Sequence, residues 1–380
     1  MAGSTMIWVF WWAAVFLIYT FAGYPFVLWL VSLWRSRPYQ RGAIQPRISL
    51  IIAAHNEAAA IRRKILNCLE LTYPKDKYEI IVASDGSDDG TTEIVRSFSP
   101  QGVKLIEIPH RCGKQYAQML ARDASQGEVL VFTDAGVELQ PDGLQKIVSN
   151  FSDPSIGCVS SEDQVIKGRA VGERSYVQLE MWLRRLESRI GSVVTASGSF
   201  FAARRTVCEV WHTDQTSDFF VPLNAVSQGL RAVVDPESLG RYGLVHSEKD
   251  ELQRKIRTIV NGLHVFFSHL HLLSPFRYGF FPWQLISHKL FRWLTPSAIL
   301  FLTVSNLFLW KTSSFYRMCF ALQVGVYGAG LLALVADRSS GWKPIRLAGY
   351  FLLGNAATLM AWFYFLGGEK FVTWQPTQRA

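Results

Sequence analysis

The chain has 380 residues, of which 49% are hydrophobic, and a formal net charge of +9 at pH 7. This apolar content exceeds that of an ordinary soluble protein. The basic residues are scattered or flank apolar segments, without the interleaved aromatic motif of an RNA-binding module, so we expect no nucleic acid as a partner. Membrane lipids and a phosphorylated ligand explain the charge. The five cysteines form no Cys-x-x-Cys pair, which argues against structural zinc.

A long apolar segment opens the chain. Residues 6–34 are almost uncharged and exceed the roughly 20 residues that are needed to cross a bilayer. The segment is too long for a signal-peptide core and lacks a cleavage site. We therefore expect residues 1–34 to be a transmembrane helix, broken or tilted near Gly23-Tyr24-Pro25.

Residues 47–270 carry most of the charge and are long enough for one domain with its own core. Apolar strands alternate with helices in the first half of this central domain, which predicts an α/β fold with a mostly parallel sheet. The expected strands are 48–54, 78–84, 103–108 and 129–133, and the expected helices are 57–71, 88–97 and 113–125. Beyond Pro141 the pattern is looser, and we expect a helix over 172–190, a strand at 198–205, a helix over 216–227 and a strand at 231–235.

Polar residues follow the first two strands. His55-Asn56-Glu57 ends the first strand, and an Asp/Gly loop over 85–90 ends the second and leads into a helix. Open α/β sheets bind ligands at the carboxyl ends of their strands, and a helix start favours an anion. The pattern therefore predicts a nucleotide site. A β-turn is an alternative, as is a calcium loop, although Arg96 stands where that loop needs Glu.

The remainder of the chain is again apolar. An amphipathic helix over 249–270 leads to the membrane, 271–295 suits the interface, and 296–367 holds three candidate spans. The spans are expected at 296–310, with a possible start near Leu290, at 315–335 and at 345–367. The distribution of Arg and Lys beside the spans predicts a multi-pass inner (plasma) membrane protein with a cytoplasmic central domain and both termini outside.

Motifs in order and in register carry a family resemblance over about residues 47–295. The chain resembles membrane-bound family-2 glycosyltransferases of the GT-A fold, in the cellulose-synthase-like branch. The matching motifs are His-Asn-Glu at 55–57, Asp-Gly-Ser-x-Asp-x-Thr at 85–91, Gly-Lys-x-x-Ala at 113–117, Thr-Asp-Ala at 133–135, Gly-Ser-Phe-Phe-Ala-Ala-Arg at 198–204, Ser-Asp-Phe at 217–219, Arg-Lys-x-Arg at 254–257 and Ser-His-Lys-x-x-Arg-Trp at 287–293.

The resemblance assigns a base pocket to the first two strand ends. It implies that Asp85 accepts the imide N–H of uracil and that Glu57 lines the same pocket. His55 either stacks on the base or packs in the core as a structural histidine.

Positive charge would neutralise the diphosphate leaving group. Asp134 is the expected ligand of a divalent metal, Mg²⁺ or Mn²⁺. Lys114 would place a point charge near the phosphates, or is a solvated lysine at a helix start. Arg254 and Arg257, one turn apart, would close over the diphosphate, or form a basic face at the membrane surface.

Inversion at the anomeric carbon needs a carboxylate that takes the proton of the acceptor. Asp218 holds the family position of this base at a predicted helix start, where amide dipoles would keep it ionised. Its local sequence alone favours a simple helix N-cap. Glu180, Glu187 and Asp214 are the other carboxylates to consider.

The chain departs from the family pattern at three places. Asp134-Ala135-Gly136 replaces Asp-x-Asp, so the second metal carboxylate is missing, and Glu138 or His246 would have to substitute. Ser217 precedes Asp218 where relatives often have an acidic residue. The segment 254–258 lacks the Trp of processive synthases.

Together these features predict an inverting glycosyltransferase that moves one sugar from a nucleotide sugar, most simply a UDP-sugar, to a membrane-associated glycan or lipid acceptor in surface polysaccharide or glycolipid assembly. A processive β-glycan synthase is one alternative. A catalytically silent nucleotide-sugar-binding scaffold is another, because the second Asp is missing.

Overall fold

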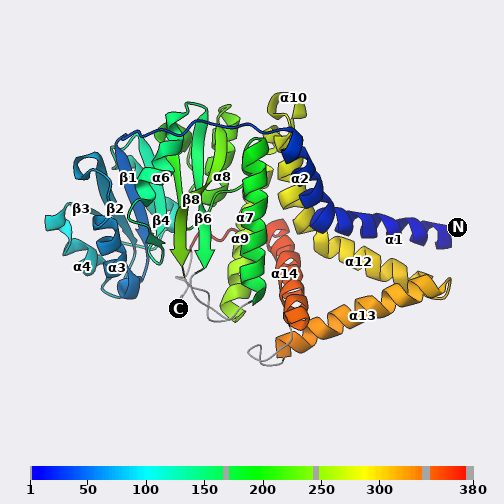
Figure 1. Ribbon diagram of the computed structural model, residues 1–380. Helices are drawn as coiled ribbons and strands as arrows, with labels where there is room; N and C mark the ends of the chain where they lie inside the picture. The colour runs from blue at the N-terminus through cyan, green and yellow to red at the C-terminus, as the bar shows by residue number, and fades with distance from the viewer. Residues whose placement is uncertain (1, 166–170, 243–247, 336–342, 374–380) are drawn as a thin grey trace.

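The computed structural model describes residues 2–165, 171–242, 248–335 and 343–373 (Figure 1). Within these ranges the strands form one eight-stranded sheet in the order β3-β2-β1-β4-β7-β6-β8-β5. The strands are β1 Ile48–Ala54, β2 Tyr78–Asp85, β3 Val103–Ile108, β4 Val129–Asp134, β5 Glu138–Leu139, β6 Ile156–Val165, β7 Phe200–Arg204 and β8 Arg231–Tyr242. The predicted α/β class and the four predicted parallel strands are confirmed.

The sheet is parallel in its first half and mixed in its second. β1 pairs in parallel with β2 and β4, and β2 pairs in parallel with β3. β7 runs antiparallel to both β4 and β6, whereas β6 and β8 are parallel. β1, β2, β4 and β6 therefore point the same way, and their carboxyl ends lie at one edge of the sheet.

Helices cover both faces of the sheet (Figure 1). They are α3 Ala58–Leu69, α4 Thr91–Arg96, α5 Lys114–Asp123, α6 Gly143–Ser149, α7 Val171–Ile190, α8 Ser217–Ser227 and α9 Glu248–Ser268, with short 3-10 turns at Lys75–Lys77, Ser99–Gln101, Asn150–Ser152, Arg205–Cys208 and Leu270–Leu273. Successive strand residues enter opposite clusters: Ile51 and Phe132 pack on one face, and Leu50 and Val131 on the other. Such double burial explains why β1 and β4 read as continuous apolar runs.

β6 was not predicted. Its central residues Ser160 and Ser161 are fully buried although they are polar. The Ser160 hydroxyl receives the backbone N–H of Ser197 and donates to the carbonyl of Ser161, so the sheet tolerates it. The apolar signal on which the strand prediction depended is therefore absent from this strand.

Four helical segments are long and apolar enough to cross a membrane, by length and composition, among the described residues: Ser4–Trp34, Phe281–Leu309, Ser314–Leu334 and Pro344–Leu366. The elements that build them are α1 Ala2–Ile18, a π-helix Tyr19–Gly23, α2 Tyr24–Trp34, α11 Phe281–Leu285, a π-helix Ile286–Leu290, α12 Phe291–Leu309, α13 Ser314–Val335 and α14 Lys343–Leu366. The first span bends between α1 and α2, where a break was expected (Figure 1).

The second span begins earlier than expected. Pro282 occupies the first turn of α11, a position where its missing N–H costs nothing, and the helix then continues through the polar residues Ser287, His288 and Lys289. The interfacial segment expected over 271–295 is therefore shorter, and its helical part is α10 Pro275–Tyr278.

The C-terminal segment returns to the central domain, which contradicts the expectation that both termini lie on the opposite side. Ile256 and Val260 of α9 are buried against Ala357 and Ala361 of α14, whose small side chains allow the two helices to pack closely. The chain then continues over the domain, where Lys370 Nζ lies 2.7 Å from Oδ2 of Asp214.

Candidate active site

Sequence-predicted site residues gather at the edge of the sheet where β1, β2 and β4 end. The loops after β1 and β2 are hydrogen-bonded to each other. Asn56, which has a positive φ of 52°, donates to Oδ1 of Asp88 at 2.8 Å and accepts from the backbone of Asp88 at 3.0 Å. Asp89 accepts from the backbone N–H groups of Ala58 and Thr91. Asp88 and Asp89 thus fix the geometry of the strand ends.

Asp85 is fully buried at the end of β2. Its carboxylate accepts the backbone N–H groups of Cys112 at 2.7 Å and Gly113 at 2.8 Å. Asp85 therefore holds the loop that follows β3 next to the end of β2. A carboxylate has about four lone-pair sites, so these two bonds leave acceptor capacity for a ligand.

The other two predicted base-pocket residues lie beside Asp85. His55 is 7% exposed, and its Nδ1 lies 2.6 Å from the carbonyl oxygen of Asp85. This contact supports the alternative in which His55 is a structural histidine. Glu57 is partly exposed at the start of α3, and its backbone N–H is bound by Thr91 Oγ1 at 2.8 Å.

Lys114 begins α5 and reaches across to β4. Its Nζ lies 2.5 Å from Oδ1 of Asp134, and both side chains are partly exposed. The preceding Gly113 has a φ of +105°, and a Cβ there would come within 2.4 Å of the carbonyl oxygen of Val372. The C-terminal segment therefore passes directly over the start of α5. Sequence reasoning missed this contact because its residues lie far apart in the chain.

Asp134 is the last residue of β4, and a buried lysine supports the strand end and the loop that follows it. Lys64 of α3 is 2% exposed and donates to Thr133 Oγ1 at 3.0 Å and to the carbonyl of Val137 at 2.6 Å. Burial lowers the pKa of Lys64, and Asp134 and Glu138 oppose that shift. Lys64 was not predicted from sequence, although a lysine on the otherwise apolar face of α3 was a signal for it.

The donor set around Asp134 fits a metal that is shared with a ligand. No three His, Cys, Asp or Glu side chains come together as a metal site in the part of the chain that the structure describes. Mg²⁺ is usually held by one or two carboxylates together with water and substrate phosphates, and Asp134 supplies one such carboxylate. Glu138 is exposed on β5, and His246 lies outside the described residues.

Asp218 lies in the first turn of α8, beside Gly198. A Cβ on Gly198 would come within 3.3 Å of Oδ2 of Asp218, so this glycine leaves room next to the carboxylate. Desolvation raises the pKa of Asp218, and Lys114, Arg184 and Lys289 oppose that rise. Burial of the carboxylate thus opposes the ionisation that was expected from the helix start, whereas the nearby cations favour it. A raised pKa is suited to a general base that works near neutral pH.

Two cations near Asp218 were missed by sequence reasoning. Arg184 of α7 is buried; its Nε forms a long ion pair with Oε1 of Glu180 at 3.6 Å, and its Nη1 has no hydrogen-bond partner among the described residues. Lys289 extends over the ring of Phe219, the neighbour of Asp218, at 5.6 Å from the ring centre. Buried guanidinium donors that make no hydrogen bond are costly, which makes Nη1 of Arg184 a candidate for an anionic ligand. The signal for Lys289 was its place inside an apolar span.

Arg254 and Arg257 lie on α9. A further arginine, Arg111 from the loop after β3, lies near them. Burial lowers the pKa of Arg257, and the nearby charges of Arg254 and Arg111 lower it further. Arg111 was not predicted from sequence. The three arginines concentrate positive charge beside the loop that Asp85 holds.

The alternative carboxylates Glu180 and Glu187 bind side chains of the candidate membrane spans. The ring nitrogens of His288, which is fully buried, lie 2.6 Å from Glu187 Oε1 and 2.9 Å from Glu180 Oε1. Tyr24 donates to Glu187 at 2.6 Å, and Arg292 to Glu180 at 2.9 Å. Burial alone would raise the pKa of Glu180, but His288 and Arg292 hold it well below the usual value. Glu180 is therefore not suited to act as a base, and the carboxylate of Glu187 is occupied by Tyr24 and His288.

The mixed sheet, with acidic and basic side chains at its carboxyl edge, defines an α/β domain of the nucleotide-binding type. Comparisons with known proteins agree. The sequence model of the family Glycosyl transferase family 2 matches residues 49–211. Residues 49–211, somewhat less than half of the chain, thus match a family-2 glycosyltransferase domain.

Two curated relatives and one solved structure are similar to the chain. It is 25% identical over 198 residues to the beta-monoglucosyldiacylglycerol synthase of Trichormus variabilis, covering 48% of this chain and 42% of that one. It is 27% identical over 199 residues to the poly-beta-1,6-N-acetyl-D-glucosamine synthase of Staphylococcus aureus, covering 50% and 48%. The chain thus spans about half the length of these relatives.

One of the similar solved structures is that of the mannosyltransferase PcManGT from Pyrobaculum calidifontis, solved with GDP-Man and Mn²⁺. It matches with a TM-score of 0.74 and 22% identity, covering 95% of this chain and 99% of that one. This likeness confirms the GT-A fold that the resemblance implied.

Proposed function

We propose that the protein is an inverting glycosyltransferase of the inner membrane, with its central domain in the cytoplasm. It would transfer one sugar from a nucleotide sugar, most simply a UDP-sugar, to a membrane-associated glycan or lipid acceptor. The observation that carries this proposal is the position of Asp218, a partly exposed carboxylate beside Gly198 with a raised pKa, next to strand ends rich in polar groups.

The donor would lie over the strand ends. Asp85 would read the base with the acceptor capacity that its bonds to Cys112 and Gly113 leave. Glu57 would line the same pocket. This arrangement fixes the nucleotide before the acceptor is needed, because the loops after β1, β2 and β3 are already connected by hydrogen bonds.

Positive charge would hold the diphosphate. Lys114, Arg254, Arg257 and Arg111 supply it from two sides, and charge-assisted hydrogen bonds to phosphate are among the strong ones. A divalent cation held by Asp134 would supply further electrostatic stabilisation of the leaving group. The ion pair of Lys114 with Asp134 must rearrange when either of them binds the diphosphate or the cation.

Asp218 would take the proton of the acceptor hydroxyl as that oxygen attacks the anomeric carbon. The bond from the sugar to the diphosphate breaks at the same carbon, and the nucleoside diphosphate leaves with the electron pair. Burial raises the pKa of Asp218, and the charges of Lys114, Arg184 and Lys289 oppose that rise, which favours the ionised form that the base needs.

Incubation of the purified protein with a panel of nucleotide sugars and membrane lipids, with detection of released nucleoside diphosphate, tests the proposal. We expect release with a uridine nucleotide sugar and a single sugar on the product. A ladder of products would instead identify a processive synthase. Binding without release for every donor would identify a silent scaffold and contradict the proposal.

A further inference from the structure

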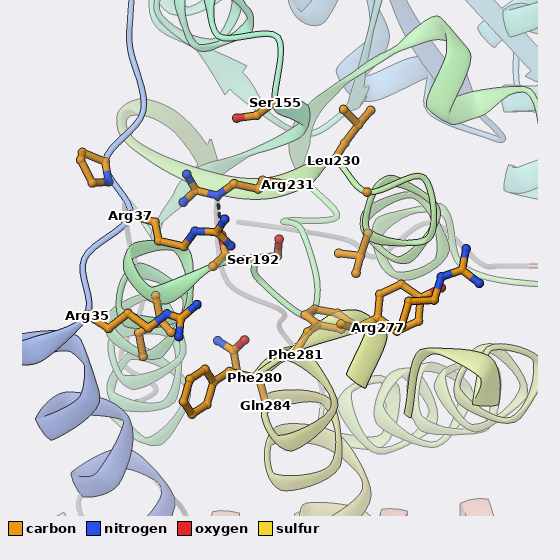
Figure 2. Close-up of a pocket in the computed structure, with 17 residues that line it drawn as sticks. Arg35, Arg37, Ser155, Ser192, Leu230, Arg231, Arg277, Phe280, Phe281 and Gln284 are labelled. Carbon is orange, nitrogen blue, oxygen red and sulfur yellow. Dashed lines mark hydrogen bonds between the residues drawn. The ribbon is translucent and has the colours of Figure 1, made fainter. Parts of the chain in front are cut away.

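A second polar cavity lies away from the candidate active site (Figure 2). Its volume is about 550 Å³, and its walls come from the end of α2, the ends of α7 and α8, the start of β8 and the α10–α11 region. Four arginines line it: Arg35, Arg37, Arg231 and Arg277. None of the lining residues that the structure describes is acidic.

Three of the arginines gather on one side of this arginine pocket. Figure 2 shows the guanidinium groups of Arg37 and Arg231 near each other and Arg35 farther along the same side of the pocket, whereas Arg277 lies on the other side. Arg231 donates from Nε to the carbonyl of Gly191 and from Nη2 to that of Ser188, both at 2.9 Å, which fixes its guanidinium.

Arg35 and Arg37 bring further positive charge to this side of the pocket. The guanidinium of Arg35 lies 4.9 Å from the ring centre of Phe280. Burial lowers the pKa of Arg231, and the charge of Arg37 lowers it further. Like charges that are brought together in this way favour a bound anion.

The arginine pocket is separate from the site around Asp218. Ser155 and Arg231, which line it, lie at the amino ends of β6 and β8, the edge of the sheet opposite to the strand ends described above. Val226, also in its wall, is eight residues beyond Asp218 on α8, which corresponds to about 12 Å along the helix axis. A group in this pocket therefore does not occupy the acceptor position.

The position of the arginine pocket in the chain indicates the membrane surface. Arg35 and Arg37 directly follow the candidate span Ser4–Trp34, and Arg277 and Phe280 directly precede the span Phe281–Leu309. Trp34 is 91% exposed and Phe276 is fully exposed on this side of the molecule. Exposed aromatic side chains beside basic residues are typical of the boundary between lipid headgroups and water.

We propose that this pocket binds the phosphate group of an anionic membrane lipid. Guanidinium groups match phosphate oxygens with paired hydrogen bonds, and the volume is in the range of small-molecule sites. Phe280, Phe281 and Ile190 supply an apolar wall for the glycerol and the first carbons of the chains. A bound lipid would contact α2, α7 and the segment before the second span, and would thereby fix the central domain against the membrane segment.

The test uses the full-length protein in neutral detergent, so that no charged bilayer surface contributes. Binding of the short-chain lipid dihexanoyl phosphatidic acid is measured by native mass spectrometry and thermal shift, against dihexanoyl phosphatidylcholine and glycerol 3-phosphate. We expect the phosphatidic acid to bind and to raise the melting temperature more than either comparison compound. The variant R35Q/R37Q should bind it at least about tenfold more weakly.

The matched control is R62Q/R63Q, which removes the same charge on α3, well separated from α10 in Figure 1. It should bind phosphatidic acid as the wild type does. If R35Q/R37Q does not fold, the single variant R37Q serves, since the side chain of Arg37 is exposed. Unchanged affinity in a folded pocket variant would overturn the proposal. Equally tight binding of glycerol 3-phosphate would also overturn it, because the site would then take free phosphate esters.

Discussion

Lys114 Nζ and Asp134 Oδ1 lie 2.5 Å apart, so the one carboxylate left of the family's metal motif is paired with a lysine. A cation and Lys114 compete for the same oxygen. The substitution of Ala135-Gly136 for a second acidic residue makes this competition more important, because no neighbouring carboxylate in the motif can take over.

This pairing predicts a weak metal requirement that Lys114 controls. Wild-type activity should need millimolar rather than micromolar Mg²⁺ or Mn²⁺, and Asp134→Ala should abolish it. Lys114→Gln should lower the half-saturating metal concentration and raise the KM for the donor. Lys146→Gln, which breaks an ion pair with Asp142 elsewhere, is the control. Full activity of the wild type in excess chelator would rule out the metal role.

Asp85 holds the loop after β3 through two hydrogen bonds and is also part of the proposed base pocket. In Asp85→Asn, one backbone N–H of the pair Cys112 and Gly113 would face an amide donor instead of an acceptor. We expect a loss of about 1–3 kcal/mol in stability and a comparable weakening of UDP binding. Thermal unfolding and calorimetry measure the two effects separately. Unchanged UDP affinity in the folded variant would remove Asp85 from the base pocket.

The pH dependence of the transfer reaction should report Asp218. The base acts only when it is deprotonated, so kcat/KM falls as the pH drops through its pKa. Lys289 opposes the rise of this pKa. Lys289→Gln should therefore shift the fall of kcat/KM on the acid side of the pH profile (the acid limb) to higher pH. Lys77→Gln, a surface change of the same charge, should leave the limb in place. If Lys289→Gln leaves the acid limb in place, Asp218 is not the group whose protonation lowers activity at low pH.

The path of residues 369–372 over the central domain predicts the topology. A cytoplasmic reporter fused at Ala380 should be active, and one fused after Thr312, between α12 and α13, should be silent. The first result follows because Lys370 and Val372 contact Asp214 and Gly113. A silent reporter at Ala380 would place the C-terminus outside after all.

Much of the first half of the domain was predictable because β1, β2 and β4 are buried on both faces and read as apolar runs. The polar strand ends could also be predicted, since the alternation of strands and helices brings them to one edge. Strand β6 could not be predicted from the sequence, because its buried Ser160 and Ser161 are residue types that are common in loops. Contacts between distant segments were equally inaccessible, such as Lys289 on the ring of Phe219.

The return of the C-terminal segment to the central domain could not be predicted for a different reason. Hydropathy identifies α14 as a candidate span, but it does not reveal that Ala357 and Ala361 are buried against α9. Helix pairing depends on the side chains of both partners, and a single segment carries only half of that information.

The transfer rate of Asp218→Asn tests the central proposal most directly. Asp218 lies in the first turn of α8 behind the N-cap Thr216, and Asn keeps the size of its side chain there but cannot accept the proton. Burial raises the pKa of Asp218, so the ionised carboxylate destabilises the fold above that pKa, and the variant should melt at the same temperature or slightly higher. With UDP binding unchanged, transfer should fall at least about a hundredfold. A folded variant with near wild-type transfer would contradict the assignment of Asp218 as the base.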